Sequence, residues 1–325
     1  MRIFVTGGAG YIGSATAAAL LAAGHSVTIY DNLSTGYRAA VPSEATFIYG
    51  NLADHRALQA ALTSARHDAI IHFAASIEAG ESMQDPGKYF LNNTANSMLL
   101  IETAVASGIE KFVLSSTAAV YQSSDDPLTE TAALGPTNVY GETKLMIEQV
   151  LRWYGQVKGL RYAALRYFNA CGALPGRGEA HQPETHLIPL VLQVALGQRA
   201  QIGIFGDDYP TPDGTAIRDY IHIADLATAH VLAVEALNTR AALIYNLGTG
   251  TGYSVNEIIA VARKVTGHAI PAEVRPRRAG DSAWLVANPA RVEEELGWER
   301  QYSDIENIIA TAWAWHRDNP RGYRS

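Results

Sequence analysis

Tyr140 and Lys144 are the residues whose types and spacing point most directly to chemistry. They stand four positions apart in "VYGETK" (139–144), so on a helix their side chains would share one face. A phenol needs about 4 kcal/mol to be half ionised at neutral pH. A lysine ammonium about 4 Å away supplies about that much at an effective dielectric constant of 20. The pair therefore predicts a base that removes a proton from an alcohol.

Hydroxyl side chains just upstream support this interpretation. The strand expected at 111–116 runs into "SSTAAVY" (115–121), which contains Ser115, Ser116 and Thr117. Ligands of parallel α/β folds bind outside the carboxyl ends of strands, so Thr117 would hydrogen-bond and position the same substrate oxygen. Taken alone, a tyrosine and a lysine at this spacing more often decorate an exposed helix. The neighbouring hydroxyls and a glycine motif favour catalysis.

That glycine motif is "VTGGAGYIGS" (5–14), between the first expected strand and the first expected helix. Gly7, Gly10 and Gly13 permit a tight turn and a close approach of the backbone to a pyrophosphate. The free amides at the helix N-terminus then bind the phosphates. Asp31 ends the second expected strand, where an acid accepts a bond from a ribose 2′-hydroxyl and repels a 2′-phosphate. The motif predicts NAD rather than NADP.

The composition excludes several other classes of function. The chain has 325 residues, a net charge of -7 and 48% apolar residues, so a nucleic-acid or anionic-membrane binder is not expected. The single cysteine, Cys171, forbids an internal disulfide and fits a reducing cytoplasm. No run reaches the roughly 18 apolar residues of a membrane span. The histidines show no HExxH or paired spacing, so no metal site is expected.

The elements that must position these residues alternate along the first half of the chain. Apolar, β-branched runs predict buried strands at 2–7, 26–31, 45–50, 69–74, 111–116 and 161–168, and later at 243–248. Helical patterns lie at 12–24, 54–64, 86–107 and 138–158, and again at 186–197, 225–238, 254–266 and 303–318. Repeated strand–helix–strand order predicts an α/β fold with a doubly wound parallel sheet.

A change in amino-acid composition after Phe168 predicts a second, smaller domain. Residues 171–184 and 203–216 are rich in Gly, Pro and Asp and resemble loops. We expect an NAD-binding domain over 1–168 and a substrate domain over 169–325. The stretch 217–248 is expected to return to the first domain.

Taken together, these motifs resemble the extended short-chain dehydrogenase/reductase family, and within it the UDP-glucose 4-epimerases. The similarity runs over nearly the whole chain and includes "DNLSTG", "HFAASIEAGES", "RYFNACGA", "FGDDYPTPDGTAIRDYIH" and "RPRRAGD". The resemblance implies a cytoplasmic enzyme with tightly bound NAD. It also implies a homodimer that pairs through the helices at about 86–107 and 138–158. The implied reaction is reversible epimerisation at C4 of a UDP-hexose through a 4-keto sugar.

The resemblance also carries site residues over by motif. Catalysis would fall to Tyr140, Lys144 and Thr117. The expected NAD contacts are Gly7, Gly10, Tyr11, Ile12, Gly13, Asp31, Asn32, Asn51, Leu52, Phe73, Ala74, Asn92, Ser115, Tyr140, Lys144 and Tyr167. The expected UDP-sugar contacts are Thr117, Asn169, Leu187, Phe205, Arg218, Tyr220, Arg278, Asp281 and Leu285. A diphosphate needs bidentate cations, and Arg218 and Arg278 lie in stretches that resemble loops.

We consider three alternative functions, two of them enzymes of this fold and one a protein without catalysis. A 4,6-dehydratase of the family carries an Asp-Glu pair after the hydroxyl, where this chain has Ala118 and Ala119, so dehydration is rejected. A UDP-uronate or UDP-pentose epimerase, and a non-catalytic NAD sensor, remain as alternatives. Asn51 stands where the family usually has Asp. Leu285 stands where some members have a bulky tyrosine, which suggests that N-acetylated UDP-sugars are also accepted.

Overall fold

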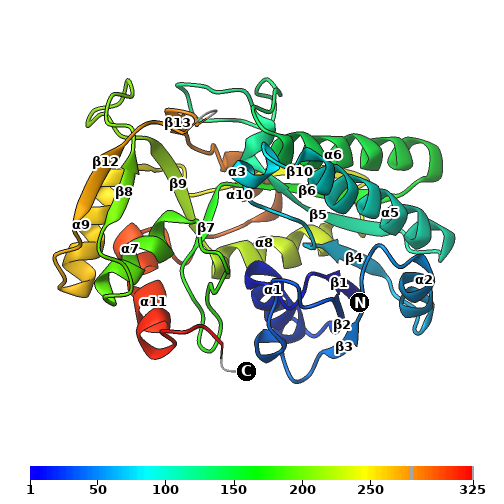
Figure 1. The fold of residues 1–325 in the computed structure, drawn as a ribbon. Helices are drawn as coiled ribbons and strands as arrows, with labels where there is room; N and C mark the ends of the chain where they lie inside the picture. The colour runs from blue at the N-terminus through cyan, green and yellow to red at the C-terminus, as the bar shows by residue number, and fades with distance from the viewer. Residues whose placement is uncertain (279–280, 324–325) are drawn as a thin grey trace.

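The computed structural model describes residues 1–278 and 281–323 and is built around a seven-stranded parallel sheet (Figure 1). The strand order is β10-β6-β5-β4-β1-β2-β3, with parallel pairing throughout. The strands are β1 (Arg2–Thr6), β2 (Ser26–Asp31), β3 (Thr46–Tyr49), β4 (Ala69–His72), β5 (Lys111–Thr117), β6 (Arg161–Tyr167) and β10 (Ala242–Leu247). The predicted doubly wound α/β fold is confirmed.

Helices cover both faces of this sheet, which is why its strands read as continuous apolar runs. On one face, Ile3 and Val5 of β1 join a core with helices α1 (Tyr11–Ala22) and α8 (Ile223–Ala236). On the other face, Phe4 joins a core with α2 (His55–Thr63), α5 (Asn96–Ala106) and α6 (Val139–Lys158). Successive residues of one strand therefore serve two separate cores.

The second part of the chain forms smaller sheets against three helices. A four-stranded sheet contains β7 (Asn169–Cys171), β9 (Ile217–His222), β11 (Gly252–Ser254) and β13 (Trp284–Leu285), and a two-stranded sheet pairs β8 (Ile202–Phe205) with β12 (Ala272–Arg275). Their core includes residues of α7 (Leu187–Ala195), α9 (Val255–Thr266) and α11 (Ile305–Asp318). These elements gather at the end of the molecule opposite α5 and α6 (Figure 1).

The two parts exchange segments of chain. Within 217–248, strand β9 belongs to the four-stranded sheet, whereas α8 packs beside α1 and β10 forms an edge of the seven-stranded sheet. One expectation was wrong: Arg218 lies on β9 and not in a loop. Its strand is recognisable only through its tertiary pairing with β11 and β13, since a short strand carries a weak sequence signal.

Short helical segments connect the main elements. The helix expected at 86–107 is divided into α4 (Pro86–Tyr89), the π-helical segment η2 (Phe90–Ala95) and α5. Further short segments are η1 (Arg38–Ala40), α3 (Ala79–Ser82), η3 (Ala118–Val120) and α10 (Ala290–Leu296). Across the described residues, none of the helices has both the length and the apolar character needed to cross a membrane.

Candidate active site

The glycine loop between β1 and α1 is packed so closely that side chains are excluded from it. A Cβ on Gly13 would lie 2.2 Å from the Gly7 carbonyl oxygen, and one on Gly7 would lie 2.5 Å from the Ala74 nitrogen. Gly7 also has a φ of +71°, which favours glycine. Helix α1 then begins at Tyr11 without a side-chain cap from Gly10. Its first amides therefore lack intrahelical partners and present an anion-binding site.

The Asp31 carboxylate, at the end of β2, holds the backbone of this glycine loop in place. It accepts hydrogen bonds from the backbone nitrogens of Ala9 at 2.9 Å and Leu33 at 2.8 Å. Burial raises the pKa of Asp31, and the two backbone bonds partly oppose that rise. A carboxylate has about four acceptor positions, so this one retains capacity for ribose hydroxyls.

The other expected cofactor residues surround the carboxyl ends of the same strands. The Phe73 ring stacks at a tilt on His230 with centroids 4.8 Å apart. Tyr167 hydrogen-bonds Ser115 and His230. Three more expected residues make hydrogen bonds to residues nearby. Asn32 accepts one from Ser34, and Asn51 accepts one each from Ala53 and Tyr30. Asn92 donates one to Ser76. Leu52 is buried in the core that contains Phe4. Ile12 is partly buried and packs against the core that contains Ile3 and Val5.

Close backbone packing brings Tyr140 to Thr117. Asn138 caps α6 by accepting from the Gly141 nitrogen at 2.9 Å. A Cβ on Gly141 would lie 2.3 Å from the Ala119 carbonyl oxygen, so this glycine allows α6 to touch η3. As a result, the Tyr140 phenol lies close enough to the Thr117 side chain for that side chain to lower its pKa. The sequence motif thus places the phenol beside the hydroxyl at the end of β5.

Lys144 lies buried one turn further along α6. Its Nζ donates to the Ser115 carbonyl oxygen at 2.8 Å. Burial lowers the pKa of this amine to about 8, against a smaller raising effect of the Glu148 carboxylate. Glu148 is itself held by a buried ion pair with Arg166, so the anion that acts on Lys144 is fixed in position.

The structure corrects the expectation that Lys144 lowers the pKa of Tyr140. Burial raises the pKa of Tyr140 to about 12, the hydrogen bond with Thr117 lowers it less, and the Glu78 carboxylate raises it further. The expectation compared the cost of ionising a phenol with attraction by Lys144, to which an oxidised nicotinamide adds a second positive charge. It omitted desolvation of the phenolate, which is the larger effect here. Ionising Tyr140 therefore requires positive charge in addition to Lys144.

On the substrate side, two arginines are held by different partners. The Arg278 guanidinium lies 3.9 Å from the centroid of the Phe205 ring. Arg218 forms an ion pair with Asp281 and donates to the Ile217 carbonyl oxygen at 2.8 Å. Both guanidinium groups are therefore oriented before any anion arrives.

Other expected substrate residues connect this group to the hydroxyl end of β5. Leu285 pairs with Arg218 in the β13–β9 register and packs against the cluster of Ala118, Val120 and Phe168 beside η3. Asn169 pairs with Tyr220 across β7 and β9, and their side chains are hydrogen-bonded. Leu187 is the first residue of α7. The structure therefore brings Leu285 next to Arg218 and to η3, whereas Leu187 lies on a separate element.

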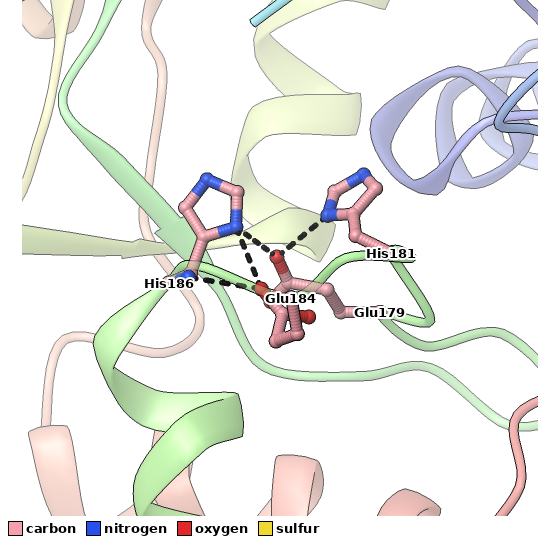
Figure 2. A group of neighbouring side chains, drawn as sticks. All are labelled: Glu179, His181, Glu184 and His186. Atoms are coloured by element: carbon pink, nitrogen blue, oxygen red, sulfur yellow. Dashed lines mark hydrogen bonds and ion pairs between the residues drawn. The ribbon is translucent and has the colours of Figure 1, made fainter. Parts of the chain in front are cut away.

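Sequence reasoning missed three groups at the site. Ser82 accepts from the Tyr140 backbone nitrogen at 3.1 Å. Glu78 accepts from Thr185 and acts on the pKa of Tyr140. Both lie in "HFAASIEAGES" (72–82), but nothing in that stretch indicates a contact with α6. The third group is a cluster of Glu179, His181, Glu184 and His186 (Figure 2), whose spacing matches no common metal motif.

Comparisons with known proteins agree with this geometry. The NAD dependent epimerase/dehydratase family matches residues 3–248. The chain belongs to that family. It is 48% identical over 327 residues to a UDP-glucose 4-epimerase from Lacticaseibacillus casei, covering 99% of both chains. A crystal structure of a UDP-glucose 4-epimerase superposes with a TM-score of 0.96 at 50% identity, with complete coverage of both chains.

A second solved family member illustrates what such a site holds. The UDP-glucose 4-epimerase from Bifidobacterium longum, in complex with NAD+ and UDP, has a TM-score of 0.95 and 35% identity, covering 99% of this chain and 100% of that one. The residues of the present chain fit the family's cofactor. The side-chain-free cradle at Gly7 and Gly13 leaves room for a pyrophosphate. The Asp31 carboxylate offers the acceptors that an adenosine ribose requires.

Proposed function

We propose that this protein interconverts UDP-glucose and UDP-galactose by reversible epimerisation at C4, using tightly bound NAD. The observation that carries the proposal is that the Tyr140 phenol and the Thr117 side chain lie close together at the end of β5, on the same edge of the sheet as the glycine loop. An alcohol carbon placed there has a base on one side and a dinucleotide site on the other.

In this proposal, each residue acts on the sugar's 4-hydroxyl or on the charge that develops there. When bound, NAD supplies a hydride acceptor and donor beside C4. Thr117 hydrogen-bonds O4 and positions it, and the Tyr140 oxygen takes the O4 proton as the C4 carbonyl forms. Lys144 stabilises the phenolate electrostatically. Once the 4-keto sugar has turned over, Tyr140 returns the proton and the opposite C4 epimer is formed.

The UDP group is proposed to lie along Arg218 and Arg278, with Asn169, Leu187, Phe205, Tyr220 and Asp281 around it. Arg218 is paired with Asp281. A bound diphosphate would therefore either share the Arg218 guanidinium with this carboxylate or displace the carboxylate from it. The gain is a bidentate, charge-assisted contact to phosphate. The ion pair keeps the guanidinium oriented, which reduces the entropy lost on binding.

The test is conversion of sugar nucleotides without added reductant. Purified protein is incubated with UDP-galactose or UDP-glucose, and the products are separated by chromatography. We expect the same fixed mixture from either direction. Absence of conversion by folded protein supplied with NAD contradicts the proposal. UDP-glucuronate and UDP-xylose are assayed in parallel, because turnover of one of these alone identifies an epimerase of another UDP-sugar.

Two neighbouring activities have weaker support. Ala118 and Ala119 form the start of η3 and offer no acid or base for removing water across C5 and C6. A sensor that binds NAD without catalysis does not need Tyr140 and Thr117 to lie side by side. Tyr140→Phe distinguishes the sensor: an enzyme loses turnover while keeping NAD, and a sensor is unaffected.

We also propose that UDP-GlcNAc and UDP-GalNAc are substrates. Leu285 lies between Arg218 and the η3 cluster, where its side chain is smaller than the tyrosine of some family members. Leu285→Tyr is expected to lower turnover of UDP-GalNAc by about tenfold or more while changing that of UDP-galactose little. Negligible turnover of UDP-GalNAc by the unaltered enzyme contradicts this extension.

The protein is proposed to be a cytoplasmic homodimer. Helices α5 and α6 lie side by side (Figure 1), and large apolar side chains on η2, α5 and α6 are exposed, namely Phe90, Leu91, Met98, Trp153 and Val157. A second copy would cover them as a four-helix bundle. Light scattering at micromolar concentration is expected to give twice the chain mass, and a monomer mass contradicts the assembly.

The division of the chain into an NAD-binding and a UDP-sugar-binding domain is also a proposal. It is supported by the separate cores beneath the seven-stranded sheet and beside α7, α9 and α11. The crossing of α8 and β10 into the first part means that neither piece would be a continuous segment.

A further inference from the structure

A cluster of two carboxylates and two imidazoles lies between β7 and α7. Each of Glu179, His181, Glu184 and His186 offers one oxygen or nitrogen atom, and these four atoms all lie within 4.8 Å of one another. Both imidazoles turn their Nδ1 atoms toward the same carboxylate oxygen (Figure 2). The segment that carries them was expected to be a loop without a metal site.

Three of the distances within the cluster are close to those between ligands around one ion, and all four donor atoms lie within 4.8 Å of one another. Oε1 of Glu179 lies 3.0 Å from Nδ1 of His181 and 2.8 Å from Nδ1 of His186. Oε1 of Glu184 lies 3.1 Å from the same His186 nitrogen. Ligands bound at about 2.0–2.1 Å to one ion are about 2.9–3.4 Å apart for angles between octahedral and tetrahedral. Because each imidazole Nδ1 now points at a carboxylate oxygen, the two carboxylates must shift aside for an ion to take the shared position between the four donors.

The charges of the cluster also suit a dication. Glu179 is buried, and among the residues that the structure describes neither carboxylate has an ion pair with a lysine or arginine. Burial opposes protonation, but the Glu179 carboxylate raises the pKa of the His186 imidazole well above its usual value. Protons on the imidazoles and a divalent ion would therefore compete to neutralise the charge of about -2 on the two carboxylates, which repel each other. One divalent ion neutralises that charge and satisfies all four donors.

The surrounding structure holds the donors in place. The Glu184 carboxylate also accepts from the backbone nitrogens of Thr185 at 2.8 Å and His186 at 2.9 Å. The Glu179 carbonyl oxygen accepts from Trp315 of α11 at 3.3 Å. These contacts fix the Glu184 oxygen and the backbone at Glu179, and holding ligands in position by neighbouring hydrogen bonds is typical of protein metal sites.

We propose that Glu179, His181, Glu184 and His186 form a binding site for one divalent transition-metal ion, with Zn²⁺ as the best match. Two imidazole nitrogens favour zinc over magnesium and calcium, which prefer oxygen ligands. Four protein ligands close the coordination sphere of a tetrahedral ion, so the role is structural. The ion would fix residues 179–186 and thereby Leu187 at the start of α7, outside the proton-transfer chemistry at Tyr140.

The first test measures zinc binding to the full chain without a histidine tag. Chelator-treated protein is titrated with Zn²⁺ at about pH 8, and the titration is repeated at about pH 9, because zinc must displace protons from the two imidazoles. We expect saturation at about one zinc per chain. Glu179→Gln and His181→Gln are expected to weaken binding by about 100-fold or more. His55→Gln, which alters an exposed imidazole on α2, is the matched control and is expected to bind as the unaltered chain does.

A second test needs no variant and therefore cannot fail through misfolding. Co²⁺ added to the unaltered, chelator-treated chain is expected to give visible absorption bands that saturate at about one equivalent and disappear when zinc is added. Absence of both zinc saturation and zinc-displaceable cobalt bands overturns the proposal and leaves the imidazoles as proton-bearing partners of Glu179. Zinc binding that Glu179→Gln and His181→Gln leave unchanged overturns the assignment equally. Neither readout depends on turnover, so the outcome is independent of the proposed epimerase activity.

Discussion

The two sides of the candidate active site hold charge by different means. On the cofactor side, the binding groups are backbone amides after β1 and the Asp31 carboxylate that fixes their loop. On the substrate side, they are the side chains of Arg218 and Arg278, each held by one partner from a distant part of the sequence. Binding by backbone amides should be weakened by substitutions that add atoms to the loop. Binding by arginine side chains should be weakened by substitutions that remove their charge.

The largest effect is expected where both sides meet, at Tyr140. Tyr140→Phe removes the proton acceptor and is expected to lower turnover of UDP-galactose by about 10³-fold, since general base catalysis contributes about 10² to 10⁴. Bound NAD is expected to stay at the level of the unaltered protein. The matched control is Tyr154→Phe, which removes a hydroxyl from the same helix at an exposed contact with Glu102. Turnover by Tyr140→Phe close to that of the control would exclude Tyr140 as the base.

The next effect concerns the buried Lys144 and depends on pH. Its folded pKa is about 8, below the ordinary value of 10.5, so the folded protein gives up this proton more readily than the unfolded chain. Relative to Lys144→Met, stability should therefore be lowest below about pH 8 and should rise by about 3 kcal/mol up to about pH 10.5. Denaturant unfolding across that range measures the difference, with Lys158→Met at the end of the same helix as control. A difference that is constant with pH contradicts a lowered pKa.

Adding one methyl group to the glycine loop, by Gly13→Ala, is expected to weaken NAD binding strongly. A Cβ on Gly13 would lie 2.2 Å from the Gly7 carbonyl oxygen, so Gly13→Ala must displace the loop. Such overpacking costs about 1–3 kcal/mol, which corresponds to NAD binding about 5- to 150-fold weaker. Gly87→Ala, where a new Cβ meets only Asp85 at 3.8 Å, is the control. Equal NAD affinities of the two variants would mean that the cradle is not the binding site.

Removing charge from the substrate side is expected to have the smallest effect of the four. Arg218→Ala loses one phosphate contact and is expected to raise KM for UDP-galactose about tenfold, with kcat changed less, because hydrogen bonds to charged groups are worth about 1.5–3 kcal/mol. Part of the loss is offset by release of the ion pair with Asp281. The control is Arg275→Ala, whose exposed arginine pairs only with Glu273 among the described residues. A fall in kcat at unchanged KM would contradict a binding role.

The same contrast explains what the sequence could predict. The fold and the glycine loop were predictable because each depends on short-range patterns, namely apolar strand runs and the spacing of Gly7, Gly10 and Gly13. The neighbourhood of Tyr140 and Thr117 was predictable because a helix and a strand end fix both residues. The strand position of Arg218 and its pairing with Asp281, 63 residues away, were not, since they depend on tertiary contacts.

Two further features were out of reach for a different reason. The direction of the Tyr140 pKa depends on burial, which spacing along the chain does not reveal. The cluster at Glu179 and His186 is formed by the path of an irregular segment, so its spacing lacks the regular period of a helix or strand. Both features become visible only when distances and exposure are known.

Retention of a deuterium label tests the central claim most directly. UDP-galactose carrying deuterium at C4 is converted in ordinary water, and the UDP-glucose formed is analysed by mass spectrometry and NMR. If C4 is oxidised and reduced within one site by a cofactor that stays bound, the product keeps its deuterium at C4. Loss of the label to solvent, or inversion only when external reductant is supplied, would contradict epimerisation through recycled NAD.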